Sequence, residues 1–521
     1  MAKSPTTAHT FSLMPRPPRL AISGLFVAAC GAVLGGAGIA AAQPITTNRG
    51  AIRPFFDLAR VARVDMVGIG DSNQLLGGHG WDEGWHVALG NTFGEYATGV
   101  VSLGENTGNG SSQGYRYGCA PSGASGQFAF TGAPAELNKY LNNPPSLLGP
   151  NNYLYVAAGA IASGAINQGL SLDSTCPISI SGPLRFHYSY GLFTGSGAGN
   201  FQPFVRFEEP PYEAVFDGGV TSTRTGDASP SRMVFASFDL PAAPRTRNIA
   251  FRATPYFSAI VGPFITYYAR CENLSTTHGA AVSSLYAVGS QSARDMAQAI
   301  NLSTDEALTL YFTHIRMTQG ADKAVLVTIS TGLNDRSEDL PSVGHGVTPG
   351  NSAAAFTDNI QFIITRLRAV WTLNNWPATE LYFLLAPSHP VEYPDTSSLV
   401  AYRNAAEQIA LNNPRTACIR LDRLTIAPEM LANGWYNSNG SDRNHLTRPA
   451  YIALAERQLL YLLKPQCPSD FNSDGGIDGQ DVQAFFEAWE SGDFLSDVND
   501  DGGVDGWDVG WFIQRWVTGE C

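Results

Sequence analysis

Short apolar runs alternate with amphipathic segments in two separate stretches of the chain. Runs of strand length occur at 64–69, 284–288, 324–330, 381–386 and 418–421. Apolar residues at helical spacing predict helices over 55–62, 83–89, 293–300, 304–317, 353–371, 399–411 and 448–464. Buried strands that alternate with helices predict a parallel sheet with helices on both faces, whose sites lie at the carboxyl ends of the strands.

Residues 153–275 follow a different pattern, in which aromatic and β-branched residues alternate with polar ones. Alternation of this kind occurs at 184–190, 201–207, 233–240, 249–253 and 264–269, with Gly and Pro turns in between. Short strands of this type predict an antiparallel sandwich or jelly roll. Because strand–helix alternation resumes at residue 276, we expect a β-rich domain inserted between two parts of an α/β domain, 43–152 and 276–465.

The first 42 residues have the pattern of an export signal. Lys3, Arg16 and Arg19 precede an apolar stretch, and Ala40-Ala41-Ala42 has the small-residue form of a cleavage site. A membrane anchor is the alternative, but the small-residue end favours cleavage. No later segment is a run of apolar residues long enough to span a bilayer. We therefore expect a soluble protein that is secreted, extracellular or periplasmic, with no membrane attachment after cleavage.

An exported chain with an even number of cysteines is expected to form disulfides. Cys30 leaves with the signal, and six cysteines remain. Six cysteines allow about fifteen pairings, and the sequence does not decide among them. Position along the chain favours Cys176 with Cys271 and Cys467 with Cys521, which leaves Cys119 with Cys418. Scattered buried thiols are the alternative.

Negative charge is concentrated at the C-terminus. The formal net charge is -13, and residues 468–521 hold thirteen Asp and Glu against Arg515 alone. This balance argues against nucleic acid as a partner and favours a bound cation.

A twelve-residue motif occurs twice in this tail, with an offset of 27 residues. Each copy has Asp or Asn at positions 1, 3, 5, 9 and 12 and Gly at position 6, as in calcium loops of the EF-hand kind. The expected Ca²⁺ ligands are Asp470, Asn472, Asp474, Gly476, Asp478 and Asp481 in the first loop, and Asp497, Asn499, Asp501, Gly503, Asp505 and Asp508 in the second. A merely solvated acidic tail is the alternative, and two matching copies argue against it.

Three polar stretches could supply the parts of a serine hydrolase site. A tight turn at Gly70-Asp71-Ser72 would lift Ser72 off the sheet edge as a nucleophile. Asn334 follows the run 324–330, and its amide can donate to a developing oxyanion. Asp442 and His445 stand three residues apart before the last helix, where they can act as orienting acid and general base. Each stretch alone also fits an ordinary turn or helix cap, so the prediction depends on all three.

Together these stretches resemble the SGNH (GDSL) hydrolase family. Its first block is G-D-S, its third is G-x-N-D and its fifth is D-x-x-H, and this chain has all three in that order, within 60–104 and 280–465. The resemblance implies a flavodoxin-like α/β/α fold with Ser72 as nucleophile, His445 as base and Asp442 as orienting acid. It also implies an oxyanion hole made by the Ser72 N–H, Asn334 and a glycine of the second block.

The sequence leaves the glycine of the second block ambiguous. Its usual distance from Ser72 points to Gly104 or Gly108. The stretch 286–295, however, has the order of strand, glycine, polar turn and helix that the block requires. Some family members that remove O-acetyl groups from polysaccharides carry a β-sandwich between the first two blocks. We therefore expect Gly289 to complete the oxyanion hole.

The duplicated loop and helix of the tail resemble a type I dockerin, a module that docks to a cohesin. Loop positions 10 and 11 are Gly479-Gln480 and Gly506-Trp507, which departs from the hydroxyl or basic pairs common in cellulosomal dockerins. The resemblance implies structural Ca²⁺ and a cohesin-like or cell-surface partner for residues 466–521.

The sequence thus predicts an α/β hydrolase domain of the flavodoxin-like α/β/α kind, an inserted β-sandwich and a small α-helical EF-hand-type domain. The expected function is a secreted serine esterase that removes O-acetyl groups from a polysaccharide, with no cofactor for catalysis. A lipid or aryl esterase is the second hypothesis. A non-catalytic carbohydrate-binding or scaffold-associated protein is the third.

Overall fold

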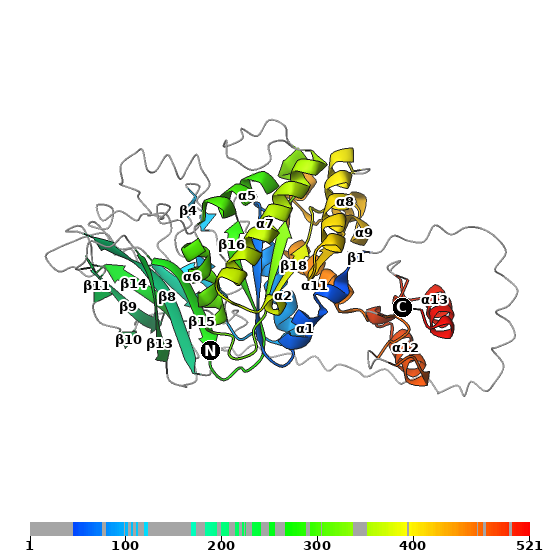
Figure 1. Cartoon of the computed structure of the whole chain (residues 1–521), viewed down its shortest axis with the longest axis horizontal. Coiled ribbons are helices and arrows are strands. Elements are labelled where there is room, and N and C mark those ends of the chain that lie inside the picture. The colour runs from blue at the N-terminus through cyan, green and yellow to red at the C-terminus, as the bar shows by residue number, and fades with distance from the viewer. Residues whose placement is uncertain are drawn as a thin grey trace, which may run out of the picture. The chain divides into compact units, whose positions relative to one another are not determined.

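The structure is a computed structural model, drawn as a whole in Figure 1. It describes residues 45–74, 80–97, 99, 101–102, 106–107, 111–112, 119–122, 168–172, 183–194, 200–207, 214–217, 221–222, 224–225, 232–240, 249–255, 266–287, 292–303, 305–336, 352–392, 395–465, 467–472, 476–499 and 503–520. The predicted export signal, 1–42, lies outside these residues. Within them, no helix is both long and apolar enough to cross a membrane.

A six-stranded sheet forms the centre of the α/β part, in the order β1-β19-β18-β17-β2-β16. Its strands are β1 (Thr46–Thr47), β2 (Arg63–Gly70), β16 (Gly279–Ala287), β17 (Val325–Ser330), β18 (Leu381–Leu385) and β19 (Thr416–Ile419). The last five pair in parallel, and β1 pairs antiparallel with β19. Numbered along the chain, the parallel strands lie in the order 2-1-3-4-5, which is the doubly wound order of flavodoxin-like sheets.

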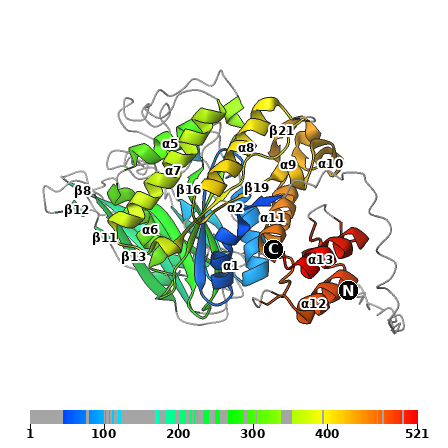
Figure 2. The ribbon, with the colours of Figure 1, turned by 45° about the vertical axis from the view of Figure 1, so that its right-hand side comes forward.

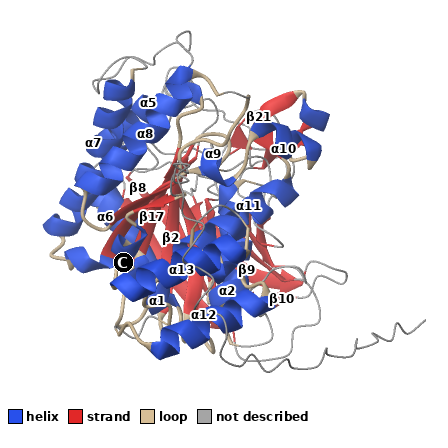
Figure 3. Cartoon of the chain, turned by 90° about the vertical axis from the view of Figure 1, so that its right-hand side faces the viewer, coloured by secondary structure: helices blue, strands red, loops and turns tan. Residues whose placement is uncertain are grey.

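Helices cover both faces of this sheet, because apolar residues alternate between the two faces of each strand (Figure 3). On β17, Val325 and Val327 belong to one core cluster, whereas Leu326 belongs to the other. The first cluster is completed by α5 (Ala293–Leu302), α6 (Asp305–Arg316), α7 (Ala353–Leu373) and α8 (Ser397–Asn412). The second is completed by α1 (Arg53–Ala59), α2 (Trp81–Phe93) and α11 (Arg448–Leu463).

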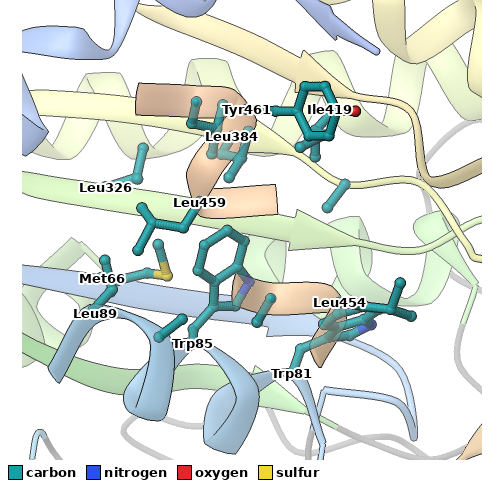
Figure 4. Packing of buried hydrophobic residues seen from close by; sticks show 14 of the residues in the cluster. Met66, Trp81, Trp85, Leu89, Leu326, Leu384, Ile419, Leu454, Leu459 and Tyr461 are labelled. Atoms are coloured by element: carbon teal, nitrogen blue, oxygen red, sulfur yellow. The ribbon is translucent and has the colours of Figure 1, made fainter. Parts of the chain in front are cut away.

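The packing of α2 against α11 brings distant parts of the sequence together. Trp85 of α2 lies near Met66 of the sheet and Leu459 of α11 (Figure 4), and all three side chains are buried. Burial of one such side chain contributes about 1.5–3 kcal/mol to stability. Because α2 follows the Gly70-Asp71-Ser72 turn and α11 follows His445, this contact holds the two ends of the α/β part beside each other.

The β-rich part consists of short strands in several sheets. They are β3 (Val101–Ser102), β4 (Asn106–Thr107), β5 (Ser111–Ser112), β6 (Cys119–Ser122), β7 (Gln168–Leu172), β8 (Leu184–Thr194), β9 (Asn200–Phe207), β10 (Ala214–Asp217), β11 (Thr221–Ser222), β12 (Arg224–Thr225), β13 (Arg232–Leu240), β14 (Ile249–Pro255) and β15 (Thr266–Asn273). One sheet has the order β10-β9-β14-β7-β6, and another has the order β12-β8-β15-β3. Strands β3 and β6 thus pair with the β-rich part although they precede residue 153. An inserted sandwich stays a prediction.

The C-terminal tail contains two similar loop–helix units. Helix α12 (Gly479–Ser491) and helix α13 (Gly506–Thr518) lie side by side (Figure 2), and the rings of Phe485 and Phe512 stack between them at 4.0 Å. Trp489 of α12 donates its indole N–H to the Asp505 carbonyl, and Trp516 of α13 donates to the Asp478 carbonyl. This reciprocal bonding follows the sequence repeat and joins the two units into one core.

Two of the predicted disulfides are wrong. Cys271 and Cys418 are buried thiols, and burial raises the pKa of each well above its ordinary value. Cys418 lies inside the central sheet, whereas Cys119 belongs to β6 of a different sheet. Cys467 is disulfide-bonded. Its expected partner Cys521, like Cys176, lies outside the described residues.

Several short elements were not predicted. They are β1, α9 (Leu421–Leu424), α10 (Ala427–Ala432), β20 (Tyr436–Asn437), β21 (Asp442–Leu446) and the 3-10 helices η1 (Arg49–Ala51), η2 (Asn334–Arg336), η3 (Ala378–Glu380), η4 (Ser438–Gly440) and η5 (Phe494–Ser496). Each has two to six residues, which is too short for a period of 2 or 3.6 residues to be recognised. The hairpin of β20 and β21 matters most here, because β21 carries Asp442 and His445.

Candidate active site and acidic loops

Ser72 lies in a tight turn directly after β2. A side chain at Gly70 would come within 2.7 Å of Cβ of Gln74 and 3.0 Å of the Ser330 carbonyl, so only glycine fits this close approach. The Gln74 N–H donates to the Asp71 carbonyl at 3.0 Å and closes the turn. Ser72 is left partly exposed at the carboxyl end of the strand.

His445 and Asp442 on β21 meet Ser72 in a chain of hydrogen bonds. Ser72 Oγ lies 2.9 Å from His445 Nε2, and His445 Nδ1 lies 2.7 Å from Asp442 Oδ2. A carboxylate can only accept, so Nδ1 is the donor to Asp442, and in the neutral ring this leaves Nε2 as an acceptor facing Ser72. The other Asp442 oxygen accepts the Asn444 N–H at 3.1 Å, which fixes the carboxylate. The three side chains form the geometry that a serine nucleophile requires.

Asn334 reaches the turn before Ser72 from the neighbouring strand β17. Gly332 has φ +112°, a backbone conformation that favours glycine and turns the chain back toward β2. Asn334 Nδ2 donates to Asp71 Oδ2 at 3.1 Å, and the Asn73 N–H donates to Asp71 Oδ1 at 2.8 Å. Burial raises the pKa of Asp71 to about 6, although its hydrogen bonds with Asn73 oppose the shift.

Asp335 joins the same corner to the start of α5. The Ala293 N–H lies 3.1 Å from both carboxylate oxygens of Asp335, and Thr331 Oγ1 donates to one of them at 3.3 Å. Burial, with a smaller contribution from the nearby Asp71, raises the pKa of Asp335 to about 7. Gly289, the expected oxyanion donor just before α5, lies outside the described residues, as do Gly104 and Gly108.

Two residues that sequence reasoning missed hold β21 in place. Buried Tyr451 of α11 donates its hydroxyl to Asn73 Oδ1 at 2.5 Å, and its oxygen accepts the Leu446 N–H at 3.4 Å. Buried His389 lies with Nε2 3.1 Å from the Arg443 carbonyl, and burial lowers its pKa to about 4, so the neutral ring donates. Nothing in the sequence marked either residue, because each acts through a partner distant along the chain.

The predicted site residues Ser72, Asp442, His445 and Asn334 therefore lie at one corner of the sheet. A neutral imidazole can take the Ser72 proton, and the Asn334 amide lies beside the residue that precedes the nucleophile. This arrangement is competent for acyl transfer.

The two acidic loops share one backbone arrangement. Asp481 accepts the N–H groups of Asn472 and Asp478, at 3.1 and 2.8 Å, and Asp508 accepts those of Asn499 and Asp505, at 3.3 and 2.9 Å. The last ligand position of each loop thus ties together loop positions 3 and 9.

The oxygen donors of both loops fit a hard cation such as Ca²⁺. In the part of the chain that the structure describes, no three His, Cys, Asp or Glu side chains converge as a metal cluster. The central ligands Asp474 and Asp501 lie outside that part, whereas the other ten expected ligand residues lie within it.

Comparison with known proteins adds only weak likenesses. No family model and no curated protein matches this chain. Among solved structures, a family two carbohydrate esterase from Clostridium thermocellum in complex with cellohexaose has 10% identity, covering 56% of this chain and 92% of that chain, with a TM-score of 0.24. A carbohydrate esterase family 2 enzyme from Corynascus thermopiles (Myceliophthora fergusii) has 12% identity, with coverages of 57% and 93% and a TM-score of 0.23.

The β-rich part has a likeness of the same strength. The CBM22-1 xylan-binding domain of Paenibacillus barcinonensis Xyn10C has 10% identity, covering 34% of this chain and 94% of that chain, with a TM-score of 0.18.

Proposed function

We propose that this chain is a secreted SGNH-type serine esterase that removes O-acetyl groups from a polysaccharide. The observation that carries the proposal is the unbroken chain of hydrogen bonds from Ser72 through His445 to Asp442. The G-D-S, G-x-N-D and D-x-x-H motifs lie together at one corner of a doubly wound sheet. Their proximity supports the family assignment.

In the proposed acylation step, His445 Nε2 takes the proton of Ser72 while Oγ attacks the ester carbonyl. Asp442 holds the ring in the tautomer that leaves Nε2 bare, and stabilises the imidazolium that forms. The imidazolium then gives its proton to the departing sugar oxygen. A water molecule, deprotonated by the same nitrogen, attacks the acyl-enzyme and releases acetate and Ser72.

The oxyanion of both tetrahedral intermediates needs preorganised donors. We propose the backbone N–H groups of Ser72 and Gly289 and the side-chain amide of Asn334 for this role. Neutral donors that are already fixed in place stabilise the developing charge without reorganisation, and one such donor is worth about 3 kcal/mol of barrier.

The openness of the site favours a polymeric substrate. The His445 and Asp442 side chains are 27% and 35% exposed, so an acetyl group that projects from a long chain can reach Ser72 without the polymer being engulfed. A lipid esterase would instead need an apolar channel for the acyl chain.

The test compares wild type with Ser72→Ala on acetylated xylan, a long-chain lipid ester and a short-chain nitrophenyl ester. We expect Ser72-dependent acetate release from the xylan and little fatty-acid release. Fatty-acid release alone would favour the lipid esterase. If neither protein turns over any ester, the site is not catalytic, and the non-catalytic carbohydrate-binding role becomes the better hypothesis.

For the rest of the chain we propose an export signal at 1–42 and a dockerin-like module that binds two structural Ca²⁺ ions and docks to a cohesin-like or cell-surface partner. Oxygen donors repeated in two loops support the calcium proposal. A cation bound only by the folded module stabilises it by about 2.7 kcal/mol at a concentration one hundred times its Kd.

Calcium removal tests the module. EDTA should lower the thermal midpoint of the tail and reduce its helical circular dichroism, because α12 and α13 start at the loops. Initial rates of ester hydrolysis should be unchanged, since no metal takes part in the proposed reaction. An EDTA-insensitive melting curve would count against the calcium proposal.

A further inference from the structure

A buried lysine connects the α/β part to the second acidic loop. Lys464 follows the last residue of α11, and its side chain is only 2% exposed. Its Nζ lies 3.1 Å from Asp497 Oδ2 and also donates to the Asp497 carbonyl. Asp497 has no exposed side-chain surface and is the first ligand position of the second loop.

Aromatic rings surround this ion pair. Nζ of Lys464 lies 4.1 Å from the ring centroid of Tyr461 and 4.3 Å from that of Phe494. The two rings meet edge to face at 4.6 Å, and the Tyr461 hydroxyl donates to Asp497 Oδ2 at 3.3 Å. Phe494 belongs to η5, between the two loop–helix units, and packs against the second core cluster of the α/β part. Cation–π contacts and ring packing thus stabilise a lysine that has little access to water.

The two loops differ at this position. Asp470, the first ligand position of the first loop, is partly exposed, whereas its counterpart Asp497 is fully enclosed. Asp497 already accepts hydrogen bonds from the Lys464 ammonium and the Tyr461 phenol. If it also coordinated Ca²⁺, two cations would lie within a few ångströms of each other in a poorly solvated space. Their repulsion is much stronger there than in water.

We propose that Lys464 is an internal counter-cation of the second loop, which competes with Ca²⁺ for Asp497. The inference rests on the proposed calcium binding. It makes the second loop the weaker of the two sites. It also means that calcium entry releases Lys464 and loosens the contact between the tail and α11.

Calcium titration of the full mature chain by calorimetry tests this competition. Lys464→Met keeps the apolar stem against the two rings but removes the charge. This substitution should lower the Kd of the weaker calcium site by about tenfold or more. Lys464→Arg, which keeps the charge, should leave that site weak, and Lys323→Met controls for loss of a lysine elsewhere. Asp470→Asn and Asp497→Asn assign the two sites to their loops.

Hydrogen exchange of the wild type gives a second measurement that needs no variant. Calcium should speed amide exchange in residues 461–467, because the release of Lys464 loosens this segment. Slower exchange there on calcium addition, or a weaker site that Lys464→Met leaves unchanged or weakens, would overturn the inference while calcium binding stands. Absence of calcium uptake by every variant would instead remove the proposed calcium sites themselves.

Discussion

At the scale of single residues, Asp71 decides how Asn334 faces the nucleophile. The carboxylate of Asp71 can only accept, so it selects the orientation of the Asn334 amide that points Nδ2 toward the Ser72 turn. One N–H of that amide is donated to Asp71 Oδ2 at 3.1 Å. We therefore expect Asp71 to be a positioning residue that acts through Asn334.

A double-mutant cycle tests this role. Asn334→Ala should lower kcat by roughly two to three orders of magnitude, since one oxyanion donor is lost. Asp71→Asn should also lower kcat in the wild-type background, with KM little changed, but it should cost far less when Asn334 is already Ala. Additive losses would mean that Asp71 acts on the fold and not through Asn334.

At the scale of elements, the site depends on a short strand held from outside. Strand β21 has five residues, and its fixed points are the Tyr451 hydroxyl on one side and the His389 ring on the other. Tyr451 also holds the Ser72 turn through Asn73, so one phenol sets the distance between the two elements that carry Ser72 and His445.

Tyr451→Phe should therefore slow turnover as well as destabilise the fold. The ring keeps its packing against Trp81, while loss of two buried bonds costs about 1–3 kcal/mol of stability. We expect a fall in kcat of about tenfold or more, from a longer mean distance between Ser72 and His445. Trp81→Phe is the matched control, since it changes the same packing and leaves the hydroxyl bonds in place. Equal kinetic effects of the two substitutions would refute the positioning role of the phenol.

The regular helices and strands could be predicted because their buried residues recur at regular spacing along the sequence. Strands covered on both faces are unbroken apolar runs, so the predicted 324–330 and 381–386 differ from β17 and β18 by a single residue at one end. The β20–β21 hairpin carries half-exposed polar side chains, which leave no period. The number of cysteines could not predict their pairing, because it does not show that Cys418 is enclosed within the central sheet.

The candidate site was partly predictable for a chemical reason. Ser72, Asn334, Asp442 and His445 belong to short motifs whose functional groups suggest roles. The residues that position them do not, because the Asn73–Tyr451 and Asp71–Asn334 bonds join residues 378 and 263 positions apart. Such partners become visible only when the sheet and α11 are assembled.

At the scale of the whole molecule, buried histidines make the fold sensitive to acid. Burial lowers the pKa of His187, His314 and His389, so the folded chain keeps these rings neutral where the unfolded chain binds protons. Stability from this source is complete above about pH 6.5 and is lost as pH falls through the lowered pKa values, which for His389 means toward about 4. Asp71 and Asp335 act in the opposite direction, because their folded pKa values of about 6 and 7 favour proton uptake by the native state.

His389→Gln isolates one of these contributions. At pH 7.5 the variant should be less stable than wild type, because the bond to the Arg443 carbonyl is altered. Below pH 6.5 the difference in stability should narrow, by at most about 1.4 kcal/mol per pH unit, since only the wild type carries the His389 ring, whereas both proteins carry His187 and His314. Urea unfolding at several pH values measures it. A difference that stays constant between pH 7.5 and 5 would contradict the assignment.

The enclosed thiol of Cys418 can report how often one edge of the central sheet opens. A disulfide reagent reacts only with a thiolate in contact with solvent, and this sulfur has neither property while β19 lies between β18 and β1. Its rate of modification in the native protein therefore counts how often that edge of the sheet opens. Peptide mapping separates this signal from that of Cys271. An opening that proceeds in oxidising surroundings also exposes Cys418 to wrong pairing, so each such event carries a chance of irreversible misfolding.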